Sequence, residues 1–204
     1  DALPILNNIG KLCSSFTQTG TNTHYTYNSN GAVLSEKKII DGVSYVNTYT
    51  YDIAGNITNI VYPDLGEVHY VYNLAGLLDR VERKESGGTF VNVISNLDYN
   101  PMGNIKTIVY PNLITTTNTY DDTKGYRLTR KLTQNNLLSK TQDLNYTYEN
   151  VGNITKIVDA SNTNTSKITN YTYDDLYRLL SSTVTNSANN QNYTETFTYN
   201  PIGN

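Results

Sequence analysis

Residues 49–58 read Tyr-Thr-Tyr-Asp-Ile-Ala-Gly-Asn-Ile-Thr, and they contain the pattern that decides the fold. The pattern is a Tyr, then Asp or Asn, then two variable residues and a Gly. Its copies start between 21 and 28 residues apart along the chain. A period of this length is typical of repeat proteins, in which each unit is one supersecondary element stacked on its neighbours. The copies start near residues 6, 27, 51, 72, 99, 120, 148, 173 and 199, the first being a degenerate one from Leu6 to Gly10.

Each copy predicts a strand that ends in a tight turn. Aromatic and β-branched residues alternate before the turn, as in residues 25–27 and 197–199, which places the aromatic rings on one face. The next four residues fit a type I turn, and 100–103 and 200–203 carry the preferred Asn, Pro and Gly. We expect strands to end at Tyr27, Tyr51, Tyr72, Tyr99, Tyr148, Tyr173 and Tyr199. We expect positive φ, which closes a bulged hairpin, at Gly31, Gly55, Gly76, Gly103, Gly152 and Gly203.

The returning strand carries apolar residues three positions apart, such as Ile57 and Ile60. This spacing does not fit a flat two-residue period, so either a bulge lies between them or both faces are partly covered. Further turn signals mark the far ends of the units: Asp41-Gly42, Pro63-Asp64, Gly87-Gly88, Pro111-Asn112, Asn135-Asn136 and Asn189-Asn190. The sequence therefore predicts an all-β fold of antiparallel β-hairpin repeats, with about sixteen strands that coil into a sheet, spiral or barrel-like shell segment. Tyrosine rings are expected to stack between neighbouring units.

A second level of repetition alternates two kinds of unit. One kind continues as in Gly55-Asn56-Ile57, and the other as in Tyr177-Arg178-Leu179 or Gly10-Lys11-Leu12. We interpret residues 1–204 as one array that is a segment of a longer repeat protein.

The composition agrees with a thin β-structure. Tyr occurs 19 times, Phe 3 times and Trp not at all, and mean hydropathy is −0.49. A net charge of −3 with scattered charges argues against nucleic-acid binding, which needs clustered Lys and Arg. Cys13 is the single cysteine, which excludes an internal disulfide, and we expect it to be a filler in a strand.

These repeated motifs resemble the Rhs or YD-repeat family over about residues 6–204. The family includes bacterial Rhs polymorphic toxins, insecticidal toxin-complex components, wall-associated proteins and teneurins. The resemblance implies a long β-sheet that spirals into a hollow shell, which in the toxins encloses a toxic domain. The Rhs core ends in an Asp-Pro-x-Gly segment associated with self-cleavage, whereas this chain has Asn200 before Pro201. Neither autoproteolysis nor a toxin activity is therefore assigned to this chain.

No group of polar residues suggests catalysis, a cofactor or a metal. His24 and His69 each precede a repeat tyrosine by three positions, in a column that elsewhere holds Thr48 or Asn145. With strands paired in order the two histidines are four strands, roughly 19 Å, apart, too far to share a metal. The acidic candidates are expected to serve turns, not calcium or acid–base chemistry: Asp52, Asp121, Asp122, Asp174 and Asp175. A Ser/His/Asp triad has nothing to orient it.

Exposed Tyr with nearby Asn and Thr can also bind sugars through stacking and hydrogen bonds. A localised sugar site is expected to break the repeat at one place, and the sequence shows no such break. Sequons follow from the Asn- and Thr-rich composition and are interpreted as structural: Asn56, Asn145, Asn153, Asn164, Asn170 and Asn192.

The main expectation is a non-catalytic wall segment of a shell that encloses or presents a toxin or effector domain. The alternative is a cell-surface adhesion or carbohydrate-binding module; an enzyme is least favoured. Expected partners are the rest of the parent shell, an enclosed toxin domain, and a glycan or cell-surface protein, but no nucleic acid. We expect a secreted or cell-surface protein, bacterial rather than eukaryotic. The strand around 194–199 is expected to associate edge to edge with another chain.

Overall fold

The computed structural model describes residues 9–17, 20–162, 164–186, 192–200 and 203. Apart from one short 3-10 helix, every regular element in these ranges is a β-strand, which confirms the all-β class. The chain divides into two compact units, Asp1–Asn96 and Leu97–Asn204. No helix in the described ranges is long and apolar enough to cross a membrane.

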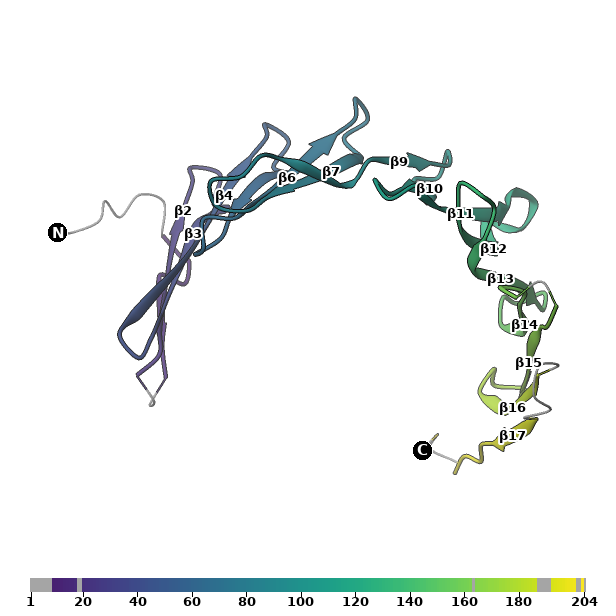
Figure 1. Ribbon diagram of the computed structural model, residues 1–204. Helices are drawn as coiled ribbons and strands as arrows, with labels where there is room; N and C mark the ends of the chain where they lie inside the picture. The colour runs from purple at the N-terminus through teal and green to yellow at the C-terminus, as the bar shows by residue number, and fades with distance from the viewer. Residues whose placement is uncertain (1–8, 18–19, 163, 187–191, 201–202, 204) are drawn as a thin grey trace. The chain divides into compact units, whose positions relative to one another are not determined.

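The first unit is an antiparallel sheet in which each strand pairs with the next one along the chain. Figure 1 shows these strands side by side in chain order, in purple to teal. Their bounds are β1 (Ser14–Phe16), β2 (Asn22–Tyr27), β3 (Val33–Ile40), β4 (Val43–Tyr51), β5 (Ile57–Val61), β6 (Glu67–Tyr72), β7 (Leu78–Lys84) and β8 (Val91–Ile94).

The second unit repeats the same sequential order, from β9 to β17. Its elements are β9 (Asn96–Tyr99), β10 (Ile105–Val109), β11 (Ile114–Asp121), the 3-10 helix η1 (Asp122–Lys124), β12 (Arg127–Asn135), β13 (Lys140–Tyr148), β14 (Ile154–Asp159), β15 (Lys167–Tyr173), β16 (Leu179–Asn186) and β17 (Tyr193–Thr196). The seventeen described strands agree with the expected total of about sixteen.

A bulge beside each repeat tyrosine explains the three-residue spacing of the apolar residues. Tyr51 pairs with Ile57 and Thr50 pairs with Asn59, so Thr58 is the extra residue. Tyr49 then pairs with Ile60, and both isoleucines share the tyrosine face of the sheet. Of the two alternatives, the bulge is confirmed. The register shifts in the same way at Tyr27, Tyr72, Tyr120, Tyr148 and Tyr173.

The repeat turns follow the prediction from the sequence. The N–H of Gly55 donates to the carbonyl of Asp52 at 3.1 Å, and the N–H of Asp52 donates to the carbonyl of Asn56 at 3.0 Å. Gly55 has a φ of 89°, in the left-handed region where a side chain is strained. The other five predicted glycines also have positive φ: Gly31, Gly76, Gly103, Gly152 and Gly203.

The turns at the far ends of the hairpins lie where the turn signals predict them, from Asp41-Gly42 to Asn135-Asn136. Three of them place a leucine, not a glycine, in the left-handed region: Leu65, Leu113 and Leu138. The Asn189-Asn190 pair lies outside the described residues.

Neither sheet has a thick core. Leu97 and Val184, at 5% and 3% exposed, are the buried hydrophobic residues of the described ranges. On the face opposite the tyrosines, hydroxyl side chains pair across strands, as Thr26 does with Ser35 at 2.7 Å. The expectation of a thin β-structure is therefore confirmed.

Three details of the sequence interpretation need correction. Cys13 is exposed and precedes β1, so it is not a filler in a strand. Tyr199 follows β17 without belonging to it, because β17 ends at Thr196. The degenerate first copy lies largely outside the described residues.

Tyrosine ring stacking is not the link between units. The ring pairs in the described ranges are Phe16 with His24 and His69 with Phe90. Repeat tyrosines lie two strands apart, which at about 4.8 Å a strand is beyond the reach of stacked rings.

Candidate functional site

The repeat tyrosine is the residue that joins one hairpin to the hairpin before it. The hydroxyl of Tyr51, at the end of β4, donates to the main-chain carbonyl of Val33, at the start of β3, at 2.7 Å. The last main-chain pair between these two strands is Ser35 with Thr48, so the carbonyl of Val33 lies beyond the end of their ladder. The tyrosine hydroxyl therefore supplies a donor where the neighbouring backbone no longer does.

The same bond recurs at each repeat position for which the contact is described. Its length is 2.6–2.8 Å throughout. The other pairs are Tyr27 with Leu12, Tyr72 with Ile57, Tyr120 with Ile105, Tyr148 with Leu128, Tyr173 with Ile154 and Tyr199 with Leu179. We call these seven bonds the tyrosine clamps. A phenylalanine would fill the same space without the bond, which accounts for the preference for Tyr.

Burial favours the protonated donor form of several clamp hydroxyls. It raises the pKa of Tyr51, Tyr72 and Tyr148 above the usual tyrosine value of 10.0. Tyr173 shows the same upward pKa shift from the same cause. A higher pKa means that the proton needed for the clamp stays in place at any physiological pH.

The two kinds of repeat unit stabilise the turn in two ways. In the Asn kind, the side-chain amide of Asn56 donates to the carboxylate of Asp52 at 2.9 Å, and Asn153 does the same to Glu149. In the basic kind, a cation lies over the ring of the next repeat tyrosine. The pairs are Lys11 over Tyr27 at 5.0 Å, Arg127 over Tyr148 at 5.9 Å and Arg178 over Tyr199 at 4.6 Å from the ring centroid.

Three of the five acidic candidates, Asp52, Asp121 and Asp174, serve the turns as predicted. The side chains of Asp122 and Asp175 make no hydrogen bond in the described ranges. Asp52 accepts hydrogen bonds from the N–H groups of Ala54 and Asn56, at 2.9 and 2.8 Å. Asp174 likewise accepts hydrogen bonds from the N–H groups of Leu176 and Arg178. Hydrogen bonds to the ionised form lower the pKa of both carboxyls. The largest cause is the bond from the Asn56 side chain for Asp52, and the bond from the Arg178 backbone N–H for Asp174.

The remaining candidates do not gather into a site. His24 lies on β2 and His69 on β6, four strands apart in the sheet. Within the described ranges, no group of three or more His, Cys, Asp or Glu side chains could hold a metal ion. The sequon residues Asn56 and Asn153 use their amides in the turns described above, whereas Asn164, Asn170 and Asn192 are exposed.

One buried carboxylate was not identified from the sequence. Asp143 on β13 is 1% exposed, and Arg130 binds it through Nε at 2.6 Å and Nη2 at 2.8 Å. Lys140 adds a third bond at 2.5 Å. The hydrogen bond from Arg130 is the main cause that lowers the pKa of Asp143 to about 2. This cluster ties three side chains of one hairpin together, because Arg130 lies on β12 and the other two on β13.

The hairpin at Tyr120 is irregular. Tyr51 pairs with Ile57, so 57 − 51 = 6, but Tyr120 pairs with Leu128, so 128 − 120 = 8. The two additional residues lengthen the turn, which contains the three-residue helix η1. Asp121 caps η1 by accepting from the N–H of Thr123 at 3.0 Å. The expectation that the repeat has no local break is therefore wrong. The sequence signal was the position of Tyr126-Arg127-Leu128, which follows Tyr120 two residues later than Tyr177-Arg178-Leu179 follows Tyr173.

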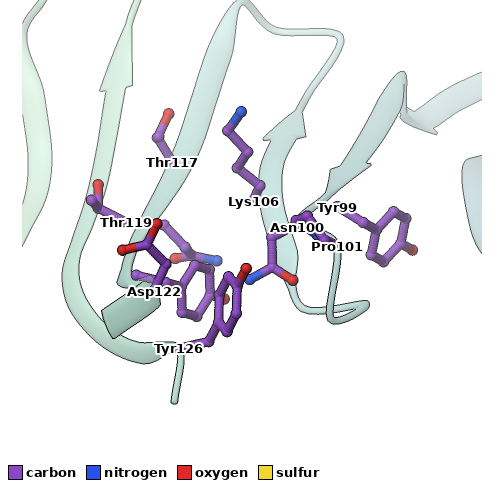
Figure 2. Close-up of a pocket in the computed structure, with 10 residues that line it drawn as sticks. Tyr99, Asn100, Pro101, Lys106, Thr117, Thr119, Asp122 and Tyr126 are labelled. Atoms are coloured by element: carbon purple, nitrogen blue, oxygen red, sulfur yellow. The ribbon is translucent and has the colours of Figure 1, made fainter. Parts of the chain in front are cut away.

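A concavity of about 480 Å³ lies beside this irregular hairpin. Its walls come from the turn after β9, from β10 and β11, and from the η1 turn. Figure 2 shows the ring of Tyr126 between the carboxylate of Asp122 and the side-chain amide of Asn100. Lys106 and Thr117 project from the neighbouring strands, and the ring of Tyr99 points away from Tyr126.

No protein-family model and no curated protein sequence matches the chain. Solved structures of similar fold are the TcdB2-TccC3 crystal structure, with a TM-score of 0.72 and 19% identity over 93% of this chain, and TcdB2-TccC3 without its hypervariable C-terminal region, with 0.73 and 18% over 96%. A third is the Photorhabdus luminescens Tc holotoxin pore, with 0.71 and 18% over 93%. The chain spans 12–13% of the length of these neighbours. At such identities the similarity establishes the fold.

Proposed function

We propose that the chain is a non-catalytic wall segment of a larger β-shell. The observation that carries this proposal is the set of tyrosine clamps, since the hydroxyl of the repeat tyrosine is bound to the backbone of the preceding hairpin. The repeat carboxylates of Asp52 and Asp174 are likewise engaged within their turns. The signature residues of the repeat thus build the sheet and are not left to act on a substrate.

The thinness of the sheets supports a wall. A single layer with half-covered faces has little core of its own, and such a layer gains stability when further repeats continue it. The proteins of similar fold are the TcdB2-TccC3 complex and a Tc holotoxin pore. By analogy with them, the parent of this chain is a secreted or surface-associated bacterial protein whose wall encloses or presents a toxin or effector domain. Its partners are then the remaining repeats and that domain.

Electron microscopy of the intact polypeptide that carries these residues tests the proposal. A hollow, closed particle is expected, with an enclosed segment that resists trypsin. A triple Tyr51→Phe, Tyr148→Phe, Tyr173→Phe variant should lose that protection because three clamps are removed.

The matched control is Tyr49→Phe, Tyr146→Phe, Tyr171→Phe, which removes three hydroxyls from neighbouring residues of the same strands that make no such clamp. Protection should survive in this control. A solid or extended particle, or equal sensitivity of both triple variants to trypsin, would contradict the proposal.

A further inference from the structure

The concavity beside η1 is notable because four of the polar side chains that line it are not used by the fold. Within the part of the chain that the structure describes, the side chains of Lys106, Asp122, Thr117 and Tyr126 make no hydrogen bond or ion pair. By contrast, Asp121, next to Asp122, caps the turn through bonds from Thr123 at 3.0 and 2.6 Å. One carboxylate of the adjacent pair holds the loop, and the other faces the concavity.

The backbone conformation of Tyr126 positions its ring beside the concavity. Tyr126 has a φ of 57°, a left-handed conformation that bulky residues rarely adopt. Tyr177 has nearly the same φ, 61°, in a regular turn, where the residue is 58% exposed. Tyr126 is more buried than Tyr177, because its ring lines the concavity. The two additional residues of the turn thus place an aromatic face beside unpaired polar groups.

The second ring of the concavity is fixed. Tyr120 donates its hydroxyl to the carbonyl of Ile105 at 2.8 Å, and the amide of Asn118 donates to the same carbonyl at 2.9 Å. These two side chains therefore form a rigid wall. Preorganised aromatic walls with a few convergent polar groups are typical of small-ligand sites, whose volumes run from about 300 to 1,000 Å³.

We propose that this concavity binds a neutral saccharide, with a sugar ring packed against Tyr126. Tyrosine rings present an apolar face to the C–H groups of a sugar, while carboxylate, ammonium and hydroxyl groups bind its hydroxyls. Lys106 and Asp122 carry opposite formal charges, so the site has no net charge and does not favour a phosphate or another strong anion. This binding would be additional to the role of the chain as a wall.

Titration of the chain with maltotriose, cellotriose and triacetylchitotriose tests the proposal. These neutral trisaccharides differ in linkage and substituent, and ¹⁵N–¹H resonances report where each one binds. Saturable shifts that cluster within residues 99–126 are expected with at least one of them. No saturable shift with any of the three, or shifts centred elsewhere, would overturn the proposal.

Substitutions distinguish binding at the proposed site from nonspecific binding to a tyrosine-rich surface. Tyr126→Gly should weaken binding by roughly tenfold, and glycine suits the positive φ, so the turn is preserved. Tyr177→Gly makes the same change at the same backbone conformation in a regular turn and should bind as the unsubstituted chain does. Asp122→Asn should also weaken binding, without touching the cap at Asp121. Unchanged affinity in Tyr126→Gly, with the fold verified by circular dichroism, would overturn the proposal.

Discussion

The hydroxyl of Tyr148 donates a hydrogen bond of 2.7 Å to the main-chain carbonyl of Leu128, across the end of the β12–β13 ladder. Arg130 with Asn145 is the last main-chain pair on that side, so the bond extends the sheet beyond its backbone pairing. One link between hairpins at this edge is thus a side chain that donates to the backbone. The first prediction tests its contribution to stability.

Tyr148→Phe should lower the free energy of unfolding by about 1 kcal/mol, because it removes one hydrogen bond and leaves the carbonyl of Leu128 without its donor. Tyr146→Phe, two residues earlier on the same strand face, should cost less, since that hydroxyl makes no hydrogen bond in the described ranges. Urea denaturation of both variants measures the difference. Equal losses in the two variants would show that the clamp adds nothing beyond the burial of the ring.

Stability should fall in acid through Asp143. Its pKa is about 2 in the folded chain against 3.8 ordinarily, so its contribution is complete above pH 3.8 and disappears as the pH falls through about 2. The shift corresponds to about 2 kcal/mol. Asp143→Asn should remove this pH dependence and also destabilise the chain at neutral pH, because Arg130 and Lys140 lose their partner.

Urea midpoints between pH 2 and pH 7 for the chain and for Asp143→Asn measure this effect. The comparison is Asp174, which pairs with Arg178 and is more exposed than Asp143. Asp174→Asn should therefore change the acid dependence of stability less than Asp143→Asn does. Identical curves for the chain and Asp143→Asn between pH 2 and pH 4 would refute the assignment.

The repeat glycine should be required for its positive φ and not for a lack of space around it. Gly55 has a φ of 89°, and no atom lies within 4 Å of the position that a Cβ would take, so a substitution meets strain but no clash. Gly55→Ala should cost about 1 kcal/mol. Gly55→Asn should cost less, because Asn tolerates the left-handed region. Thermal unfolding of the two variants distinguishes them, and an alanine variant as stable as the parent would mean that the turn relaxes to another form.

The strand β17 lies at one end of the order of its sheet and is exposed along its length. It has one charged residue and no proline, so little prevents it from pairing with another chain. We expect the chain to associate edge to edge, and Phe197→Lys or Thr198→Lys to reduce that association. Light scattering measures it, with Ser29→Lys in an exposed turn as the control for added charge. A monomer before any substitution would contradict the expectation.

The amino-acid sequence by itself determined the local architecture. Tyr51, Asp52 and Gly55 predict the strand end, the turn and the positive φ, because these interactions lie within about ten residues and depend on local backbone preferences. The spacing of Ile57 and Ile60 left two alternatives, a bulge or two partly covered faces, and the strand register decided for the bulge.

Only the tertiary structure decided what the side chains do between hairpins. The tyrosines were expected to stack, but the spacing of the strands puts their rings out of reach of one another and brings each hydroxyl to the carbonyl of the preceding hairpin. The burial of Asp143 and the concavity at Tyr126 likewise depend on residues far apart in the sequence coming together. Local periodicity contains no information about such contacts, because they depend on side-chain reach across paired strands.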